Sequence, residues 1–260
     1  MSDATDDLAE ERHGSVLVLR LNRPAARNAL TPQLITALGA AVAAAESDPE
    51  VRAVVLTGTG DRAFCAGMDL RSFAAGESIG TGDDEATAGF YRLLDGVVNV
   101  PVIGAANGTA LAGGLELLLG CDIVVASQDA VFGLPEVKRG LFAAGGGTAI
   151  GRRIPLGAAL ELVLTGDSID AGRAFELGLL YRVVPAADVL PTAVALAQRI
   201  AENAPLGLAA SKELARLAVT DADRATERLD HWRSVVFASD DAREGATAFV
   251  EKRPPVWHGR

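Results

Sequence analysis

The chain has 260 residues, of which 49% are hydrophobic and 22% are charged, a balance typical of a globular protein rather than a disordered chain. A chain of this length forms one large domain or two that pack closely, and it buries a core without disulfides or metals. Gly, Asn or charged residues interrupt every apolar run before it reaches the roughly 18 residues of a membrane span. The acidic start, MSDATDDLAEE, is unlike a signal peptide. We therefore expect a cytoplasmic protein without a membrane span.

The formal net charge is −10, and the first eleven residues carry acids but no base. We expect residues 1–12 to form a flexible acidic tail. The rest of the chain is also acidic and has no basic stripe, which argues against nucleic acid as a partner. An anionic small molecule remains compatible, because a few arginines and backbone N–H groups can hold one.

Cysteine and histidine are scarce, and their positions exclude several kinds of site. Cys65 and Cys121 cannot build a disulfide framework and do not form a CxxC pair, which favours a reducing compartment. His13, His231 and His258 lie near the two ends of the chain. A histidine-ligated metal or a Ser–His–Asp triad would need a histidine among the central glycine-rich motifs. We expect neither of these sites, and no metal.

Strands and helices alternate over the first two thirds of the chain. Apolar or alternating runs predict strands at 15–21, 51–58, 101–106 and 121–126. Thr31 is a candidate N-cap and Pro32 the first residue of a helix to about Glu46. Further helices are expected up to about Val98 and over 115–119. This alternation predicts an α/β fold.

Other stretches have a different character. Phe73–Asp84 is rich in Gly, Ser and acidic residues and predicts a mobile loop, and Gly108–Gly114 predicts a loop of small residues. From about Gly157 onward the pattern is mostly helical. It predicts one short strand at 181–184 and amphipathic helices at 193–203, 206–217 and 224–237.

Two glycine-containing segments are candidates for binding through the backbone. Phe64–Leu70 follows a buried strand, and its small residues let N–H groups approach a ligand, although from this segment alone a plain β-turn is the simpler interpretation. Asn107–Glu116 places two glycines at a helix start, where unpaired N–H groups and the helix dipole favour negative charge. It matches neither the GxGxxG fingerprint nor a P-loop, so we expect no dinucleotide or nucleotide phosphate there.

Glu116 and Glu136 are candidates for acid–base chemistry. Glu116 lies in an apolar helix, where an unpaired carboxylate is costly. Two neighbouring carboxyl groups split their pKa values and so supply one acid and one base. The alternative is that each glutamate forms a structural salt bridge with a nearby arginine, and the residues alone leave both interpretations open.

Several of these segments occur together in an order that resembles the enoyl-CoA hydratase/isomerase (crotonase) superfamily. They are Asn22–Pro24, Asn28–Leu30, Ala66–Asp69, Asn107–Glu116, Pro135-Glu136 and Leu164–Gly166. The resemblance covers nearly the whole chain. It implies an α/β spiral of repeated strand–strand–helix units over 13–195 and a C-terminal helical oligomerisation region over 196–260. It also implies a homotrimer or a dimer of trimers.

The resemblance further implies an acyl-CoA substrate whose thioester oxygen lies between the N–H groups of Met68 and Gly113. Charge collects on that oxygen when water adds to a conjugated thioester, so two donors there stabilise the transition state. Both glutamates stand at hydratase-like positions, with Glu116 orienting and deprotonating one water and Glu136 supplying the proton to the α-carbon. No metal or redox cofactor is needed, because CoA is part of the substrate.

More substrate-binding positions follow from the same resemblance. They are Ala26, Arg27, Ala66, Asp69, Leu70, Arg71, Pro135, Ala144 and Lys252. Arg27 and Arg71 would contact the nucleotide and pantetheine of CoA, and Lys252 a phosphate, with solvated surface charge as the alternative for all three. Ala143-Ala144 departs from the Pro-Gly that many family hydratases have there.

Three other functions remain open at this point. A double-bond isomerase of the same fold would rely on Glu136 alone. The Leu-Pro-Glu context of Glu136 and the Lys138-Arg139 pair resemble carnitinyl-CoA dehydratases. A non-catalytic acyl-CoA-binding protein would hold the thioester without turnover.

Overall fold

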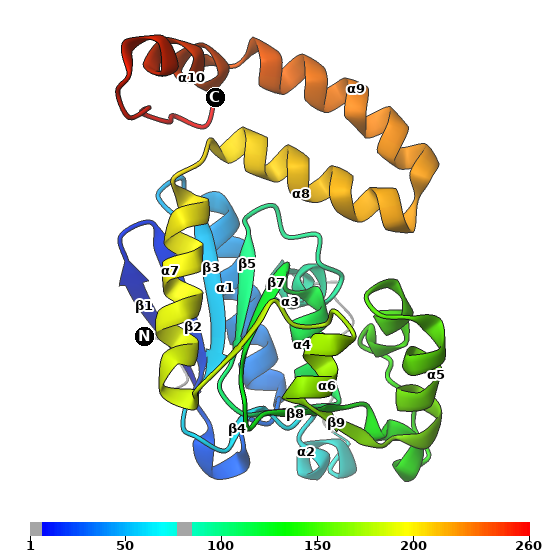
Figure 1. Cartoon of the computed structure of the whole chain (residues 1–260). Coiled ribbons are helices and arrows are strands. Elements are labelled where there is room, and N and C mark those ends of the chain that lie inside the picture. The colour runs from blue at the N-terminus through cyan, green and yellow to red at the C-terminus, as the bar shows by residue number, and fades with distance from the viewer. Residues whose placement is uncertain (1–6, 77–84) are drawn as a thin grey trace.

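The structure is a computed structural model that describes residues 7–76 and 85–260. Its strands are β1 (Leu8–His13), β2 (Val16–Leu21), β3 (Ala53–Gly58), β4 (Ala63–Cys65), β5 (Val102–Ala106), β6 (Thr109–Leu111), β7 (Ile123–Ser127), β8 (Val131–Gly133), β9 (Ser168–Asp170) and β10 (Arg182–Val184). A six-stranded sheet has the order β1-β2-β3-β5-β7-β10, and a four-stranded sheet has the order β4-β6-β8-β9. The smaller sheet lies across the lower ends of the larger one (Figure 1).

Helices connect and cover these strands. The α-helices are α1 (Pro32–Ser47), α2 (Leu70–Ala74), α3 (Glu85–Leu94), α4 (Gly113–Gly120), α5 (Leu156–Thr165), α6 (Ala171–Glu176), α7 (Val189–Ala201), α8 (Pro205–Thr220), α9 (Ala222–Ala238) and α10 (Asp240–Glu251). The 3-10 helices are η1 (Pro24–Ala26), η2 (Pro135–Arg139), η3 (Gly147–Arg152) and η4 (Ala186–Asp188). Thr31 caps α1 as expected, because its side chain accepts the N–H of Leu34.

The chain winds as a spiral of strand–strand–helix units, which confirms the predicted α/β fold class. Each of β3, β5 and β7 in the large sheet leads into a short strand, β4, β6 or β8, in the small sheet. The chain then returns through helical segments, and β2, β3, β5, β7 and β10 are parallel. Every turn therefore brings the C-terminal end of a large-sheet strand to the small sheet.

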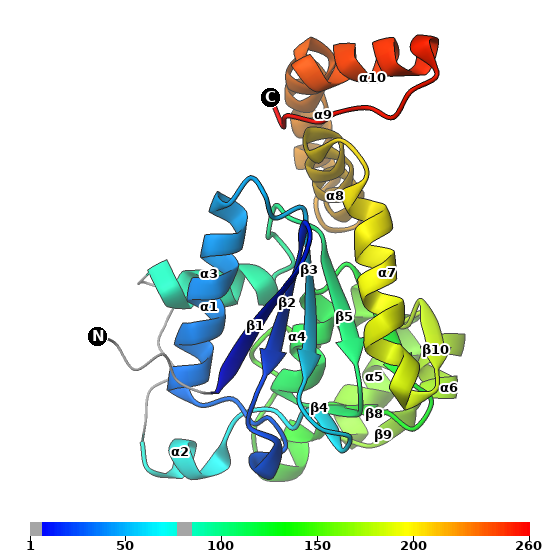
Figure 2. The same cartoon turned by 90° about the vertical axis from the view of Figure 1, so that its left-hand side faces the viewer.

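The large sheet buries both of its faces. In β2, Leu17 and Leu19 belong to the main core, whereas the alternate residues Val16 and Val18 pack in a second core with residues of α7. Figure 2 shows α1 and α3 on one side of the sheet and α7 on the other. Burial on both faces explains why β3 and β5 are continuous apolar runs.

The expected flexible acidic tail is wrong for residues 8–12, which lie in β1 (Leu8–His13). This strand pairs antiparallel with β2, from Leu8 opposite Leu21 to His13 opposite Val16. Its side chains are mostly exposed, so backbone hydrogen bonds rather than an apolar pattern hold it at the sheet edge. Residues 1–6 of the expected tail lie outside the described residues.

Two expected loops also need correction. The start of the predicted loop Phe73–Asp84 belongs to α2, while residues 77–84 lie outside the described residues. Within the expected loop Gly108–Gly114, residues Thr109–Leu111 form β6, which pairs with β4 and β8. Three-residue strands carry too little periodicity to be recognised from the sequence.

The expected boundary at 195/196 falls inside α7, whose Val189, Ala193, Ala197 and Ala201 are buried against the large sheet. This helix therefore belongs to the core. The helices that stand apart from the sheets are α8, α9 and α10 (Figures 1 and 2). None of the helices in 7–76 and 85–260 has the length and apolar character required to cross a membrane.

Candidate active site

Met68 lies in a short backbone bridge that fixes the direction of its N–H. Leu30 pairs with Met68 as an isolated parallel bridge: the N–H of Leu30 donates to Gly67 O at 2.8 Å, and the N–H of Asp69 donates to Leu30 O at 2.8 Å. Because these bonds use the groups on either side of Met68, the N–H of Met68 itself points away from Leu30. A Cβ atom added to Gly113 would lie 3.7 Å from Met68 N, so the two segments are adjacent.

Gly113 begins α4 after an unusual backbone turn. Ala112 has φ 51° and ψ −127°, a left-handed conformation that is rare for a residue with a side chain. Its N–H donates to Gly133 O at 2.9 Å, which holds it in place. As the first residue of a helix, Gly113 has no carbonyl within the helix to receive its N–H. Within 7–76 and 85–260, no acceptor is found for the N–H of Met68 or Gly113.

Gly67 allows these two segments to touch. It has φ +89°, and a Cβ atom there would lie 2.7 Å from the Cβ of Ala112 and 3.1 Å from the N of Gly113. A side chain would therefore both strain the backbone and push the two amides apart. The Met68 and Gly113 N–H groups thus lie in adjacent segments at the positive end of α4, which is where a pair of oxyanion donors is expected.

Glu116 is held by backbone N–H groups from a distant glycine segment. Its side chain is buried on the first turn of α4, and Oε1 accepts the N–H of Gly147 at 2.9 Å. Burial raises the pKa of Glu116; the hydrogen bond from Gly147 opposes this, the charge of Glu136 raises it further, and the N–H of Gly145 lowers it. The balance leaves the pKa above its ordinary value.

Glu136 presents a buried carboxyl oxygen without a partner. It lies in η2, and in the described residues its Oε2 has no hydrogen bond. Burial raises the pKa of Glu136, against the opposing effects of its own backbone N–H and the charge of Arg139. The structure does not support the alternative that each glutamate forms a structural salt bridge. Glu116 is bound by backbone amides, and Glu136 Oε2 has no partner in the described chain. A buried acceptor of this kind is suited to a ligand or a water.

The segment Gly145–Gly147 contacts the Glu116 carboxyl group, a contact that the sequence analysis did not predict. A Cβ atom on Gly145 would lie 2.6 Å from Glu116 Oε2, and one on Gly147 would lie 3.0 Å from Oε1. Three consecutive glycines after Ala143-Ala144 were the available signal, because glycine permits close backbone approach. Ala144 itself is exposed next to this segment.

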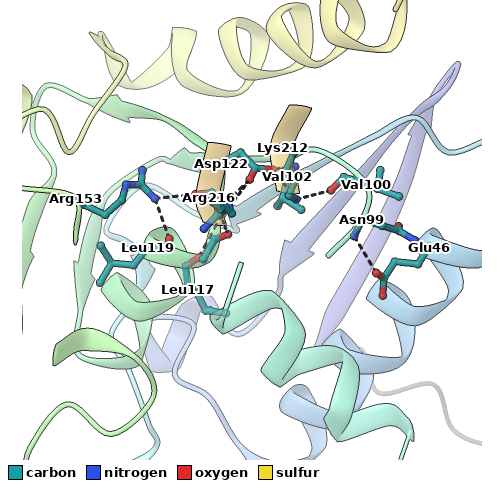
Figure 3. A network of polar contacts seen from close by, with 12 residues as sticks. Glu46, Asn99, Val100, Val102, Leu117, Leu119, Asp122, Arg153, Lys212 and Arg216 are labelled. Atoms are coloured by element: carbon teal, nitrogen blue, oxygen red, sulfur yellow. Dashed lines mark hydrogen bonds and ion pairs between the residues drawn. The ribbon is translucent and has the colours of Figure 1, made fainter. Parts of the chain in front are cut away.

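A partly buried polar cluster fixes the other end of α4 (Figure 3). Arg153 donates to Leu119 O at 2.9 Å, and Arg216 of α8 donates to Gly120 O at 2.9 Å. Asp122 binds both Arg216, at 2.9 Å, and Lys212, at 2.8 Å. Cations at a helix C-terminus interact favourably with the helix dipole. The helix that carries Gly113 and Glu116 is therefore anchored to both the core and α8.

Several of the expected substrate-binding residues lie in segments next to Met68 and Glu136. Ala66 donates its N–H to Arg27 O at 3.0 Å, so the loop at η1, with Ala26, lies beside the Met68 segment. Leu70 and Arg71 are exposed on α2, and Pro135 precedes Glu136 in η2. Within 7–76 and 85–260, no group of three or more His, Cys, Asp or Glu is arranged to hold a metal.

Two expectations are changed by the structure. Lys252 ends α10 at the opposite end of the molecule from α2 (Figure 1), because α8 and α9 carry it away from the sheets. It does not join the other residues within one chain. Asp69 already binds protein groups: its carboxylate accepts the N–H of Arg71 at 3.1 Å and contacts Arg23 at 3.3 Å.

The two-sheet spiral, with Gly113 and Glu116 both on the first turn of α4, agrees with the fold that the resemblance implies. The family model described as Enoyl-CoA hydratase/isomerase matches residues 11–260, and the chain belongs to this family.

Relatives agree over nearly the full length. The chain is 39% identical over 260 residues to the enoyl-CoA hydratase EchA19 of Mycobacterium tuberculosis, covering 98% of this chain and 97% of that protein. It is 38% identical to the carnitinyl-CoA dehydratase of Salmonella enteritidis, covering 98% and 100%. A crystal structure of an enoyl-CoA hydratase from M. tuberculosis H37Rv matches with a TM-score of 0.90 at 39% identity, covering 98% and 100%.

Proposed function

We propose that the protein adds water to the double bond of a 2-enoyl-CoA and, in reverse, removes water from the 3-hydroxyacyl-CoA. The observation that carries this proposal is the pairing of Glu116 and Glu136. Glu116 is buried and Glu136 is half-buried with a buried Oε2 atom, both have raised pKa values, and the charge of Glu136 acts on Glu116. Strands β6 and β8 lie next to the Met68–Gly113 donor pair. Glu116 lies on α4, which follows β6, and Glu136 lies in η2, which follows β8. Family membership supports the same reaction.

In the proposed hydration, the thioester oxygen accepts the N–H groups of Met68 and Gly113. Ionised Glu116 takes a proton from one water while the oxygen of that water bonds to C3. The electrons of the double bond move toward the thioester oxygen, and an enolate forms. Protonated Glu136 then gives its proton to C2. The proton passes from Glu116 to Glu136 before the next turnover, so the net reaction is addition of one water. Each oxyanion donor contributes about 3–4 kcal/mol in reactions of this kind.

The raised pKa values suit these roles. A general acid is most effective when its pKa lies near the working pH, and burial moves both glutamates in that direction. The N–H groups of Gly145 and Gly147 favour the ionised form of Glu116, which fits the base. Glu136 Oε2 has no donor in the described chain, which fits the acid. The mechanism uses no metal or redox cofactor, because CoA is part of the substrate.

The proposed assembly is a homotrimer or a dimer of trimers. Large apolar side chains are exposed on the C-terminal helices, among them Phe237 at 82%, Phe249 at 85% and Val250 at 79%. Burial against other copies would remove this apolar surface from water. Arg27 and Arg71 are exposed beside the donor pair and are proposed to contact the nucleotide and pantetheine of CoA. The free, buried Cys65 and Cys121 fit the proposed cytoplasmic location.

A second candidate reaction is dehydration of a carnitinyl-CoA-like substrate. The 38% identity to a carnitinyl-CoA dehydratase favours it, as does the Leu134–Glu136 context followed by Lys138-Arg139. The chemistry would be the same, with a polar or cationic acyl group in place of an alkyl chain.

A panel of enoyl-CoA and 3-hydroxyacyl-CoA thioesters tests the proposal, with loss or gain of the conjugated thioester absorbance as the readout. We expect hydration of at least one 2-enoyl-CoA. Movement of a double bond without water addition would indicate an isomerase, and that activity should survive Glu116→Gln. Binding without turnover of any thioester would indicate a non-catalytic binder and would overturn the proposal.

A further inference from the structure

Arg23 connects the two segments that flank the Met68 bridge. Its Nη1 donates to Ala29 O at 2.6 Å and lies 3.3 Å from Asp69 Oδ2. Ala29 directly precedes Leu30, and Asp69 directly follows Met68. The guanidinium also lies 3.4 Å from Asp7. Its side chain is 20% exposed and that of Asp69 16%, so the contact is largely sheltered from water.

The loop that carries Arg23 has a fixed shape. Asn28 is fully buried with φ 54°, and its Nδ2 donates to Thr59 O at 3.0 Å and Ala63 O at 2.9 Å. Its Oδ1 accepts the backbone N–H of Arg23 at 3.0 Å. Asparagine tolerates this left-handed conformation when its side chain is hydrogen-bonded locally. The loop is therefore pinned to the turn between β3 and β4, and the Arg23 side chain starts from a fixed position.

Movement of Leu30 relative to Asp69 would turn the N–H of Met68. The two bonds of the Leu30–Met68 bridge hold the peptide groups on either side of Met68. Arg23 joins the two strands of this bridge through a third, charge-assisted contact, which is stronger than a neutral hydrogen bond. Asp69 accepts the N–H of Arg71 as well, so its carboxylate also fixes the start of α2.

We infer that Arg23 is a positioning residue that, through Ala29 and Asp69, aims the Met68 N–H at the thioester oxygen. Asp69, which the sequence suggests as a substrate-binding residue, then acts as its partner and not as a substrate contact. This inference rests on the proposed function, because it assigns Arg23 a part in the same donor pair.

A positioning role has a distinct kinetic signature. The Met68 N–H matters most when charge develops on the thioester oxygen, so a misaimed donor lowers kcat and leaves KM nearly unchanged. It also reduces the polarisation of a bound thioester carbonyl. If Arg23 had a purely structural role, its loss would lower the unfolding midpoint and the active fraction. It would change neither the kcat of the folded enzyme nor the polarisation of the bound carbonyl.

The test compares Arg23→Met, Arg23→Lys and Asp69→Asn with the wild-type protein. Arg92→Met is the matched control, because it breaks another part-buried ion pair, Arg92–Glu46 at 2.7 Å, which ties α3 to α1. Three quantities are measured: kcat and KM for a short 2-enoyl-CoA, the thermal unfolding midpoint, and the shift in absorbance of bound cinnamoyl-CoA. That absorbance moves to longer wavelength as its carbonyl is polarised.

We expect Arg23→Met to lower kcat by about 10- to 100-fold, since displacements near 1 Å cost up to ~10² in rate. KM should change by less than about threefold, and the absorbance shift should shrink. Asp69→Asn should act in the same direction, Arg23→Lys should restore part of the loss, and Arg92→Met should leave kcat and the shift unchanged.

The inference is overturned if Arg23→Met and Asp69→Asn both keep the full absorbance shift, whatever their kcat. It is also overturned if their kcat falls no further than that of Arg92→Met. If wild type does not hydrate any enoyl-CoA, the proposed function fails, and the absorbance shift of bound cinnamoyl-CoA still decides the role of Arg23. If Arg23→Met does not fold, the isosteric Asp69→Asn gives the same comparison.

Discussion

Glu116 and Glu136 come from elements separated by two strands, yet the charge of Glu136 adds to burial in raising the pKa of Glu116. The spiral explains this relationship. One of its turns places α4 after β6, and the next places η2 after β8, and β6 and β8 are hydrogen-bonded neighbours. Two carboxyl groups twenty positions apart therefore reach one site, where a single water can lie between them in the proposed reaction.

Gly145→Ala should disable Glu116 without a general loss of structure. The three atoms nearest the added Cβ all belong to the Glu116 carboxyl group, and the closest is Oε2 at 2.6 Å. We expect kcat to fall by about 10² or more, because the base is displaced from its backbone donors. Gly157→Ala is the control, since a Cβ there meets nothing within 4 Å. Equal hydration rates for the two variants would contradict the role of the glycine segment.

Gly67→Ala should separate the two oxyanion donors. The added Cβ would lie 2.7 Å from the Cβ of Ala112 at a backbone φ of +89°. We expect a loss of about 10²–10³ in kcat, the usual effect of losing one oxyanion donor. Gly178→Ala controls for backbone strain alone, because Gly178 has φ +83° and an added Cβ meets nothing within 4 Å. A kcat for Gly67→Ala that matches that of Gly178→Ala would argue against the donor pair.

Glu136→Gln should stabilise the protein at neutral pH and not at acid pH. Burial raises the pKa of Glu136 in the folded state, so the folded protein holds this proton more tightly than the unfolded chain. Ionising Glu136 in the folded state lowers the free energy of unfolding. This destabilisation is absent below the ordinary pKa of glutamate, grows as pH rises to the raised pKa of the folded state, and is fully present above it. Thermal unfolding at about pH 4 and pH 8 should show a higher midpoint for the variant only at the higher pH. The exposed Glu161→Gln serves as control, and an unchanged midpoint for Glu136→Gln at the higher pH contradicts the assignment.

Arg216→Met should destabilise the protein more than the loss of a surface ion pair. Arg216 joins α8 to the last carbonyl groups of α4 and to Asp122, and its side chain is 27% exposed. We expect the free energy of unfolding to fall by roughly 1–3 kcal/mol, because Asp122 and the helix end lose a sheltered partner. Arg173→Met, which breaks an exposed pair with Glu176, should change it by less than about 0.5 kcal/mol. Denaturant titration distinguishes the two, and similar values would contradict the anchoring role.

The long strands could be predicted because strands buried on both faces consist almost entirely of apolar residues. Val51–Gly58 and Pro101–Ala106 are apolar runs, and the structure has β3 and β5 there within two residues of the predicted ends. The strands of the small sheet could not be predicted, because each has three residues and forms by pairing with distant segments. Strand β1 was missed for a different reason: its side chains are mostly exposed, and its ladder is made by the backbone.

The residues of the site also divide into those that could be predicted from the sequence and those that could not. Glu116, Glu136, Met68 and Gly113 stand in motifs that are local in sequence, and the structure brings their segments together. Arg23 acts across 46 positions on Asp69, and the Gly147 N–H reaches Glu116 across 31. No local pattern encodes such contacts, because they depend on how successive turns of the spiral pack.

The central claim is that both glutamates act on one water and one substrate, and the hydration rate of a short 2-enoyl-CoA tests it most directly. Wild type, Glu116→Gln, Glu136→Gln and the double variant are compared by loss of the conjugated thioester absorbance, with unfolding midpoints as a check on folding. We expect each single variant to lose about 10²–10⁴ in kcat with little change in KM, and the double variant to be only slightly worse, because groups that act as a unit are not additive. A folded single variant that keeps more than about a tenth of the wild-type kcat would contradict the account, since each group must supply at least ~10².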